Sequence, residues 1–186
     1  MRVLRRKLLE STPALLRGYP ALMIAGPRQS GKTTLARLIS PDLPYVNFES
    51  PIERADFDRD PVGFLSRFPG GAILDEIQHV PDALAYLQVR IDEEPAMGGW
   101  VLTGSQQVVL SRQSAQSLAG RVAMLELLPF SHGELTEGGV APTSLTEAVF
   151  RGGYPPLYDA DRDLAPSLCL CVDGWLQILL VVQGQL

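Results

Sequence analysis

The sequence predicts an α/β protein built on a parallel β-sheet that is covered by helices on both faces. Short, continuously apolar runs such as ALMIAG at residues 21–26 are typical of strands that are buried on both faces of such a sheet. These runs alternate with stretches of helical character, and strands that alternate with helices form right-handed crossover units. The alternation itself therefore indicates the fold class.

Five segments have the character of strands, and they lie at residues 21–26, 45–49, 72–75, 100–104 and 122–127. The helical segments between them are expected at residues 32–39, 60–68, 82–92 and 108–118. An amphipathic helix, or a pair of short ones, is expected from Leu4 to about Leu16, with Pro13 interrupting the run. Tyr45 and Phe48 are expected to pack in the sheet.

The chain after Pro129 becomes helical again, at residues 132–136 and 145–151, before the turn-rich segment GGYPPLY. We expect this part to form the start of a small helical lid. The predicted organisation is a core at residues 1–130, which includes the N-terminal helix, followed by residues 131–186. This second part is expected to be a partial helical lid and the start of a truncated C-terminal region.

The composition excludes several classes of protein. The chain has 186 residues, 46% hydrophobic and 20% charged, which is typical of a globular domain with a substantial core. Its net charge of −5 argues against a dedicated nucleic-acid binder, although one local basic groove stays possible. The short basic cluster Arg5, Arg6 and Lys7 is interpreted as a solvated face rather than a nucleic-acid site.

Cysteine usage and hydropathy give expectations about the compartment. Two cysteines, Cys169 and Cys171, are too few to support a disulfide framework or a zinc site, so a reducing cytoplasm is expected. No secretory signal is expected at the N-terminus. The apolar segment at residues 164–182 is interrupted by Pro166 and Asp173, and a charge at mid-bilayer costs about 3 kcal/mol, so a membrane span is not expected.

The clearest motif is Gly-Pro-Arg-Gln-Ser-Gly-Lys-Thr at residues 26–33, which fits the phosphate-binding pattern G-x-x-x-x-G-K-[ST] between a strand and a helix. Its glycines allow backbone N–H groups to turn toward phosphate oxygens, and the helix N-terminus adds further donors. The alternative is an ordinary glycine-rich turn. The residues expected to bind the nucleotide are Gly26, Pro27, Arg28, Gln29, Ser30, Gly31, Lys32, Thr33 and Thr34.

Lys32 is expected to reach the β- and γ-phosphates as a point charge, and the hydroxyl of Thr33 is a hard oxygen ligand suited to Mg²⁺. Asp75 and Glu76 follow an apolar strand, where an Asp can hold Mg²⁺ through water. A Glu directly after it can deprotonate attacking water, which favours hydrolysis over transfer to a bulky acceptor. Without the loop upstream, this acidic pair would indicate only a solvated turn.

The next strand ends in LTGSQQ, where a polar side chain beside the phosphate loop can bind the lytic water or the γ-phosphate. Thr103 and Ser105 are the two candidates for this sensor, and a capped turn is the alternative. His79 is interpreted as a structural histidine at a helix entrance.

The segments GPRQSGKTTLA, LDEIQHVPDALAYLQ, LTGSQQ, SQSLAGRVAMLELLPFS and GGYPPLY resemble, in this order, a family of prokaryotic AAA+ ATPases. The resemblance runs from about Arg5 to Tyr158. It implies a P-loop NTPase three-layer sandwich with a five-stranded parallel sheet of order 5-1-4-3-2. It also implies that ATP and Mg²⁺ are the ligands, with Lys32, Thr33, Asp75 and Glu76 in the roles given above.

Arginines in AAA+ proteins often complete a neighbouring subunit's site, so the resemblance makes a homo-oligomer a possible partner arrangement. Arg121 and, with less support, Arg112 are the candidates, and a surface ion pair is the alternative for either. The turn from Gly152 to Pro155 resembles the Gly-x-Pro turn that brings a lid to the nucleotide in related signalling ATPases; a plain loop is the alternative. Family members continue for about another domain, so a truncated chain is expected.

The sequence thus supports Mg²⁺-dependent ATP binding and hydrolysis as the first hypothesis. A P-loop kinase of a small molecule is the second, and a strand between the loop strand and the Asp75 strand would favour the ATPase. A non-catalytic, nucleotide-gated interaction module, or a truncated remnant, is the third.

Overall fold

The computed structural model describes residues 4–105 and 120–158, and the chain divides into two compact units. One, here called the sheet unit, consists of residues 8–26 and 32–127. The other, here called the second unit, contains the described residues 4–7, 27–31 and 128–158.

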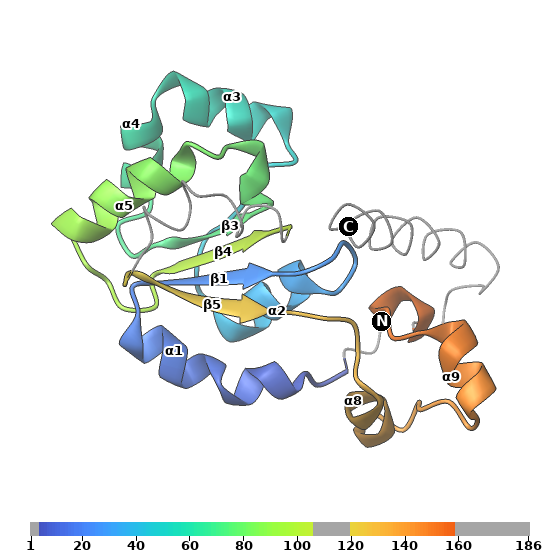
Figure 1. Ribbon diagram of the computed structural model, residues 1–186. Helices are drawn as coiled ribbons and strands as arrows, with labels where there is room; N and C mark the ends of the chain where they lie inside the picture. The colour runs from blue at the N-terminus through green and yellow to red at the C-terminus, as the bar shows by residue number, and fades with distance from the viewer. Residues whose placement is uncertain (1–3, 106–119, 159–186) are drawn as a thin grey trace, which may run out of the picture. The chain divides into compact units, whose positions relative to one another are not determined.

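The sheet unit is organised around a parallel β-sheet, which has five strands in the part of the chain that the structure describes (Figure 1). They are β1 (Ala21–Ala25), β2 (Tyr45–Asn47), β3 (Ala72–Asp75), β4 (Trp100–Gly104) and β5 (Val122–Glu126). Their order is β2-β3-β4-β1-β5, which is the expected order read from the other edge. Strand β4 therefore separates β1 from β3, and the predicted fold class is confirmed.

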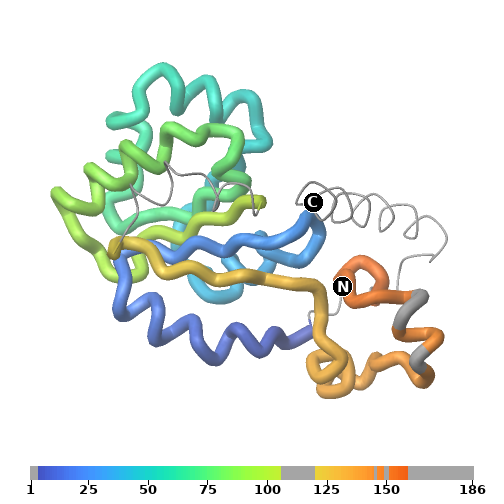
Figure 2. Tube along the Cα trace, in the orientation of Figure 1, coloured from blue at the N-terminus to red at the C-terminus, as the bar shows by residue number. Residues whose placement is uncertain are grey.

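Helices cover both faces of this sheet. One face carries α1 (Thr12–Gly18) and α2 (Lys32–Ile39), and the opposite face carries α3 (Pro51–Arg59), α4 (Pro61–Ser66) and α5 (Ala83–Glu93). Two short 3₁₀ helices are η1 (Lys7–Glu10) and η2 (Ile77–His79). The trace in Figure 2 shows β1, in blue, between β4 and β5, so the first strand of the chain becomes an interior strand of the sheet.

Successive side chains of the interior strand β1 point to opposite faces of the sheet and so belong to two separate cores. Ala21 and Met23 belong to the cluster under α3, α4 and α5, whereas Leu22 and Ile24 belong to the cluster over α1 and α2. All five side chains of β1 are buried, which explains why its sequence is continuously apolar instead of alternating.

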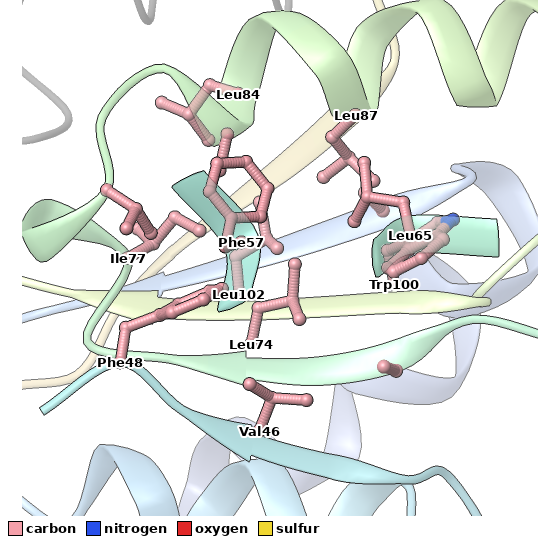
Figure 3. Packing of buried hydrophobic residues seen from close by; sticks show 14 of the residues in the cluster. Val46, Phe48, Phe57, Leu65, Leu74, Ile77, Leu84, Leu87, Trp100 and Leu102 are labelled. Carbon is pink, nitrogen blue, oxygen red and sulfur yellow. The ribbon is translucent and has the colours of Figure 1, made fainter. Parts of the chain in front are cut away.

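Helix α3 is the element that sequence periodicity missed. Its sequence PIERADFDR buries a single apolar side chain, Phe57, while Ile52 is 78% exposed, so no helical stripe exists to be detected. The chemistry of its N-terminus is nevertheless typical: Ser50 caps the helix by accepting a hydrogen bond from the Glu53 N–H, and Pro51 begins it. The ring of Phe57 packs edge-on against Phe48 and Phe64, over the side chains of β3 and β4 shown in Figure 3.

Pro13 does not interrupt a helix, and of the two expected arrangements the pair of short helices is present, as η1 and α1. It lies in the first turn of α1, where proline lacks only an N–H that has no helical partner in any case. The N-terminal run is accordingly divided into η1 and α1. Leu8, Leu9, Leu15 and Leu16 from the two helices pack against the same core.

The second unit has its own apolar cluster, formed by Leu4, Leu135, Tyr154, Leu157 and Tyr158. Its helices are α8 (His132–Glu137), α9 (Leu145–Arg151) and the 3₁₀ helix η3 (Pro155–Tyr158). Ser131 and Glu134 form a reciprocal capping box at the start of α8. The two predicted helices after Pro129 are therefore present.

Arg6 is buried in this unit, so the basic cluster is not a uniformly solvated face. Its guanidinium lies 4.4 Å from the centroid of the Phe130 ring, donates to the carbonyl of Leu128 and pairs with Glu134 at 3.5 Å. Burial alone would raise the pKa of Glu134, but hydrogen bonds from the N–H groups of Ser131 and Lys7 and the charge of Arg6 hold that pKa below its usual value. These contacts attach the N-terminal segment to α8.

None of the helices in the described part of the chain is both long enough and apolar enough to cross a membrane. The segment at residues 164–182 and the predicted helix at 108–118 lie outside the described residues.

Gly71 sits where two connections approach closely. Its φ is +97°, and a Cβ added there would lie 1.7 Å from the carbonyl oxygen of Gly99. The preceding residue, Gly70, has open space within 4 Å of its added Cβ. Replacing Gly71 by alanine would therefore create a steric clash, whereas the same replacement at Gly70 would not.

We predict that Gly71→Ala lowers the free energy of unfolding by about 2–4 kcal/mol, because both the positive φ and the backbone contact oppose a Cβ. Gly70→Ala is the matched control and should change it by less than about 1 kcal/mol. Urea unfolding followed by circular dichroism measures both variants. Equal stability of the two variants would contradict the close approach of these connections.

Candidate nucleotide and magnesium site

The loop between β1 and α2 has the backbone of a phosphate-binding loop. Gly31 has φ +95° and Gln29 has φ +63°, so both residues have a positive φ, which residues with a Cβ rarely adopt. The side chain of Ser30 is only 1% exposed, and its hydroxyl has no hydrogen-bond partner among the described residues. A buried, unpartnered hydroxyl in such a loop fits a polar ligand such as a phosphate.

Lys32 is the first residue of α2 and is 5% exposed. Its ammonium group donates a hydrogen bond of 3.1 Å to the carbonyl oxygen of Gly26, at the other end of the loop. The lysine thereby bridges the two ends of the loop. Within the second unit, Pro155 Cγ lies 3.9 Å from the place that a Cβ would take on Gly31, so the GGYPPLY segment approaches this loop residue.

Asp75, at the end of β3, is 3% exposed and accepts hydrogen bonds from three hydroxyl groups. The hydroxyl of Thr33 lies 2.8 Å and 3.1 Å from its two carboxylate oxygens. The hydroxyl of Tyr45 lies 2.6 Å from Oδ2, and that of Thr103 donates to Oδ1. These contacts fix the carboxylate beside the first turn of α2.

Tyr45 belongs to the site, although sequence reasoning assigned it only a packing role. Burial raises the pKa of its hydroxyl, and so do the hydrogen bond to Asp75 and the charge of that carboxylate; nearby Arg37 opposes the shift. The guanidinium of Arg37 lies 3.9 Å from the centroid of the tyrosine ring. The tyrosine therefore remains a protonated donor to Asp75.

Glu76 follows Asp75 in the left-handed backbone conformation, with φ +56° and ψ +47°. For a residue with a Cβ this conformation costs about 1–2 kcal/mol. Its N–H donates to the hydroxyl of Thr103 at 3.1 Å, so this hydroxyl accepts from Glu76 and donates to Asp75. Thr103 thus contacts both acidic residues, and Glu76 as a whole is partly exposed.

Gln78 is the other residue of the site that sequence reasoning did not select. Its amide nitrogen donates to the carboxylate of Glu76, and its amide oxygen accepts from the N–H of Ser105 at 3.3 Å. Ser105 enters the network through its backbone. The signal that could have found Gln78 is its position two residues after Glu76 in a tight turn, η2.

Arg28, Thr34 and Arg121 are also among the predicted site residues. Arg28 is exposed, and Thr34 lies in the first turn of α2. Arg121 precedes β5 at the amino end of the sheet and pairs with Asp92, whereas Asp75 ends its strand at the carboxyl end. Its predicted role is consequently possible only toward another subunit. Arg112 lies outside the described residues.

Residues 18–136 match a family model described as an AAA domain. The chain belongs to this family. An uncharacterized protein of Mycobacterium tuberculosis and one of Mycobacterium bovis are each 34% identical to the chain over 143 residues, or 76% of the chain. Those residues make up 31% of either relative, so the chain spans about a third of the length of the curated relatives it matches.

Two solved structures share the fold of this AAA domain at low identity. A Walker-type ATPase of Pyrococcus abyssi has a TM-score of 0.56 at 15% identity, covering 98% of this chain and 76% of that one. A signal transduction ATPase with numerous domains and a tetratricopeptide repeat sensor, from Pyrococcus horikoshii, has a TM-score of 0.51 at 16% identity. The latter comparison covers 92% of this chain and 32% of that one. Family and fold together support nucleotide binding.

We predict that Thr103→Val lowers the free energy of unfolding by about 2 kcal/mol, because the buried Asp75 carboxylate and the Glu76 N–H both lose a partner. Thr103→Ser keeps the hydroxyl and should recover most of that loss, apart from the missing methyl group. Urea unfolding measures both. A valine variant as stable as the serine variant would contradict the bridging role of this hydroxyl.

Proposed function

We propose that this AAA domain binds ATP together with Mg²⁺ and hydrolyses it. The observation that carries the proposal is the hydroxyl network that joins Thr33, Asp75 and Thr103 and places Glu76 directly beside it. It brings the hydroxyl of Thr33, at the start of α2, into contact with Asp75, which lies 42 residues later in the chain.

The loop residues bind the phosphates in this proposal. Backbone N–H groups of residues 28–33, which include the N-terminus of α2, act as donors, and the ammonium of Lys32 supplies the positive charge. The unpartnered hydroxyl of Ser30 gains an acceptor. Of the residues outside this loop, none is assigned to the nucleotide base, so ATP is proposed from the family.

The oxygens of Thr33 and Asp75 would hold Mg²⁺, because a hydroxyl and a carboxylate are the hard oxygen ligands that this ion prefers. When bound, Mg²⁺ supplies neutralisation of the charge that develops on the phosphates. Tyr45 and Thr103 keep the Asp75 carboxylate oriented toward Thr33. These hydrogen bonds position the site before any ligand arrives.

Glu76 is the proposed general base, which accepts a proton from the water that attacks the γ-phosphate. Glu76 follows the carboxyl end of β3 and is partly exposed, while Asp75 is buried. Strand β4, inserted between β1 and β3, favours this hydrolytic assignment over a small-molecule kinase, whose sheet would place those strands side by side. From the family resemblance we also propose a homo-oligomer in which Arg121 contacts the γ-phosphate of the nucleotide bound to a neighbouring subunit.

We predict that Lys32→Ala weakens nucleotide binding at least about 100-fold, because the phosphates lose the loop's buried cation and the loop loses the bridge between its ends. Isothermal titration with ATP or ADP in the presence of Mg²⁺ measures the dissociation constants. Lys7→Ala, which truncates a lysine with an exposed side chain, is the matched control and should bind like the wild type. Wild-type affinity in Lys32→Ala would disprove the assignment of the loop.

We predict that Glu76→Gln keeps the affinity for nucleotide within about threefold and lowers kcat about 10²- to 10⁴-fold, because the amide cannot accept the proton. Phosphate release under saturating ATP is the measurement. Glu49→Gln, at an exposed position, controls for the loss of one negative charge. Equal turnover by wild type and Glu76→Gln would remove Glu76 as the base.

The non-catalytic alternative gives a different outcome in the same experiments. If the wild type binds nucleotide but releases no phosphate at high protein concentration, the domain is a nucleotide-gated interaction module. Because the matched residues make up only 31% of either curated relative, the partner or substrate moved by hydrolysis is not assigned.

A further inference from the structure

We propose that Gln78 is a positioning residue for Glu76, acting through its side-chain amide. This inference rests on the proposed function, because it concerns the group that accepts the proton. The amide lies between the carboxylate of Glu76 and the backbone N–H of Ser105, and it contacts both.

The direction of the amide is determined by its neighbours. The N–H of Ser105 can only donate, so the oxygen of the Gln78 amide must face it. The NH₂ group then necessarily faces Glu76, where it donates to Oε2. A glutamine at this position is therefore fixed in one of its two orientations, and the orientation it takes is the one that binds an ionised carboxylate.

The backbone that carries Gln78 is fixed as well. It lies in η2, where the N–H of His79 donates to the carbonyl of Glu76 at 3.1 Å and the N–H of Val80 donates to that of Ile77 at 3.0 Å. The side chain of Ile77 is fully buried in the core below α5. Glu76 and Gln78 are thus held on one tight turn, and the amide limits which way the carboxylate points.

The network also connects the two strand ends that carry the site. Glu76 follows β3, and Ser105 follows β4. Thr103 links these ends through the backbone N–H of Glu76, whereas Gln78 links them through the carboxylate itself. Gln78 is the side chain in the described site that acts on the reactive oxygens of Glu76, and its loss leaves Thr103 and Asp75 in place.

The test compares Gln78→Met, Gln78→Glu and the matched control Gln88→Met, which makes the same change on α5. We expect Gln78→Met to lower kcat about 10- to 100-fold, a range typical of a displaced catalytic group, with KM for ATP and the dissociation constant of Mg²⁺–ADP within about threefold of wild type. Gln78→Glu keeps an acceptor for Ser105 but sets a carboxylate against Glu76, so its kcat should fall further. Gln88→Met should match the wild type.

A double-mutant cycle separates positioning from general damage. In a Glu76→Gln background, Gln78→Met should lower the residual kcat by less than about threefold, because the group it positions has already been lost. A structural role would lower kcat by the same factor in both backgrounds and would overturn the proposal. Unchanged kcat in Gln78→Met would overturn it directly.

Binding of Mg²⁺–ADP with aluminium fluoride, which imitates the transferred phosphoryl group, provides a readout without turnover. Gln78→Met should lose affinity for this complex about 10-fold or more while retaining its affinity for Mg²⁺–ADP. A wild type that binds Mg²⁺–ADP but neither hydrolyses ATP nor gains affinity with aluminium fluoride would refute the proposed hydrolysis and this inference together. If the wild type hydrolyses ATP and gains affinity with aluminium fluoride, and Gln78→Met behaves identically, the inference alone is refuted.

Discussion

The arrangement of the site depends on one buried carboxylate. Asp75 is almost completely removed from solvent, and a carboxylate in that position is tolerated only when hydrogen bonds replace its lost water. Three hydroxyl groups supply them, from α2, β2 and β4. Because each comes from a different element, the carboxylate ties together the helix that follows the phosphate loop and two of the strands. The order of the strands is what makes this possible, since β3 lies between β2 and β4.

Strand positions and the phosphate loop were predictable because each depends on local pattern. Strands β3 and β4 and helices α2 and α9 occupy the predicted residues, and the inserted position of β4 follows from the family resemblance. Helix α3 escaped prediction because a helix held by one aromatic ring shows no apolar period. Its polar sequence still carried a capping serine and an initial proline, which are signals of a helix start that do not depend on hydropathy.

The residues missed at the site were missed for a different reason. Tyr45 contacts Asp75 across 30 positions of sequence, and Gln78 contacts Ser105 across 27, so neither belongs to a local motif. A tyrosine at the start of a strand normally indicates packing, and part of its ring does pack. Arg6 shows the converse: three successive basic residues suggested a solvated face, yet the middle one is buried against Phe130 and Glu134. Charge patterns report composition, and tertiary contacts decide which charges are covered.

The left-handed backbone of Glu76 has an evolutionary consequence. A glycine at this position would remove the conformational cost of the left-handed backbone, but it would also remove the carboxylate. The folded state would then be more stable, and the proposed general base would be absent. Selection for robust folding alone would favour that replacement. A residue with a Cβ in such a conformation fits a position where the side chain has a role that a glycine cannot fill. Among relatives, a glycine at this position would mark copies of the domain that have been freed from that requirement.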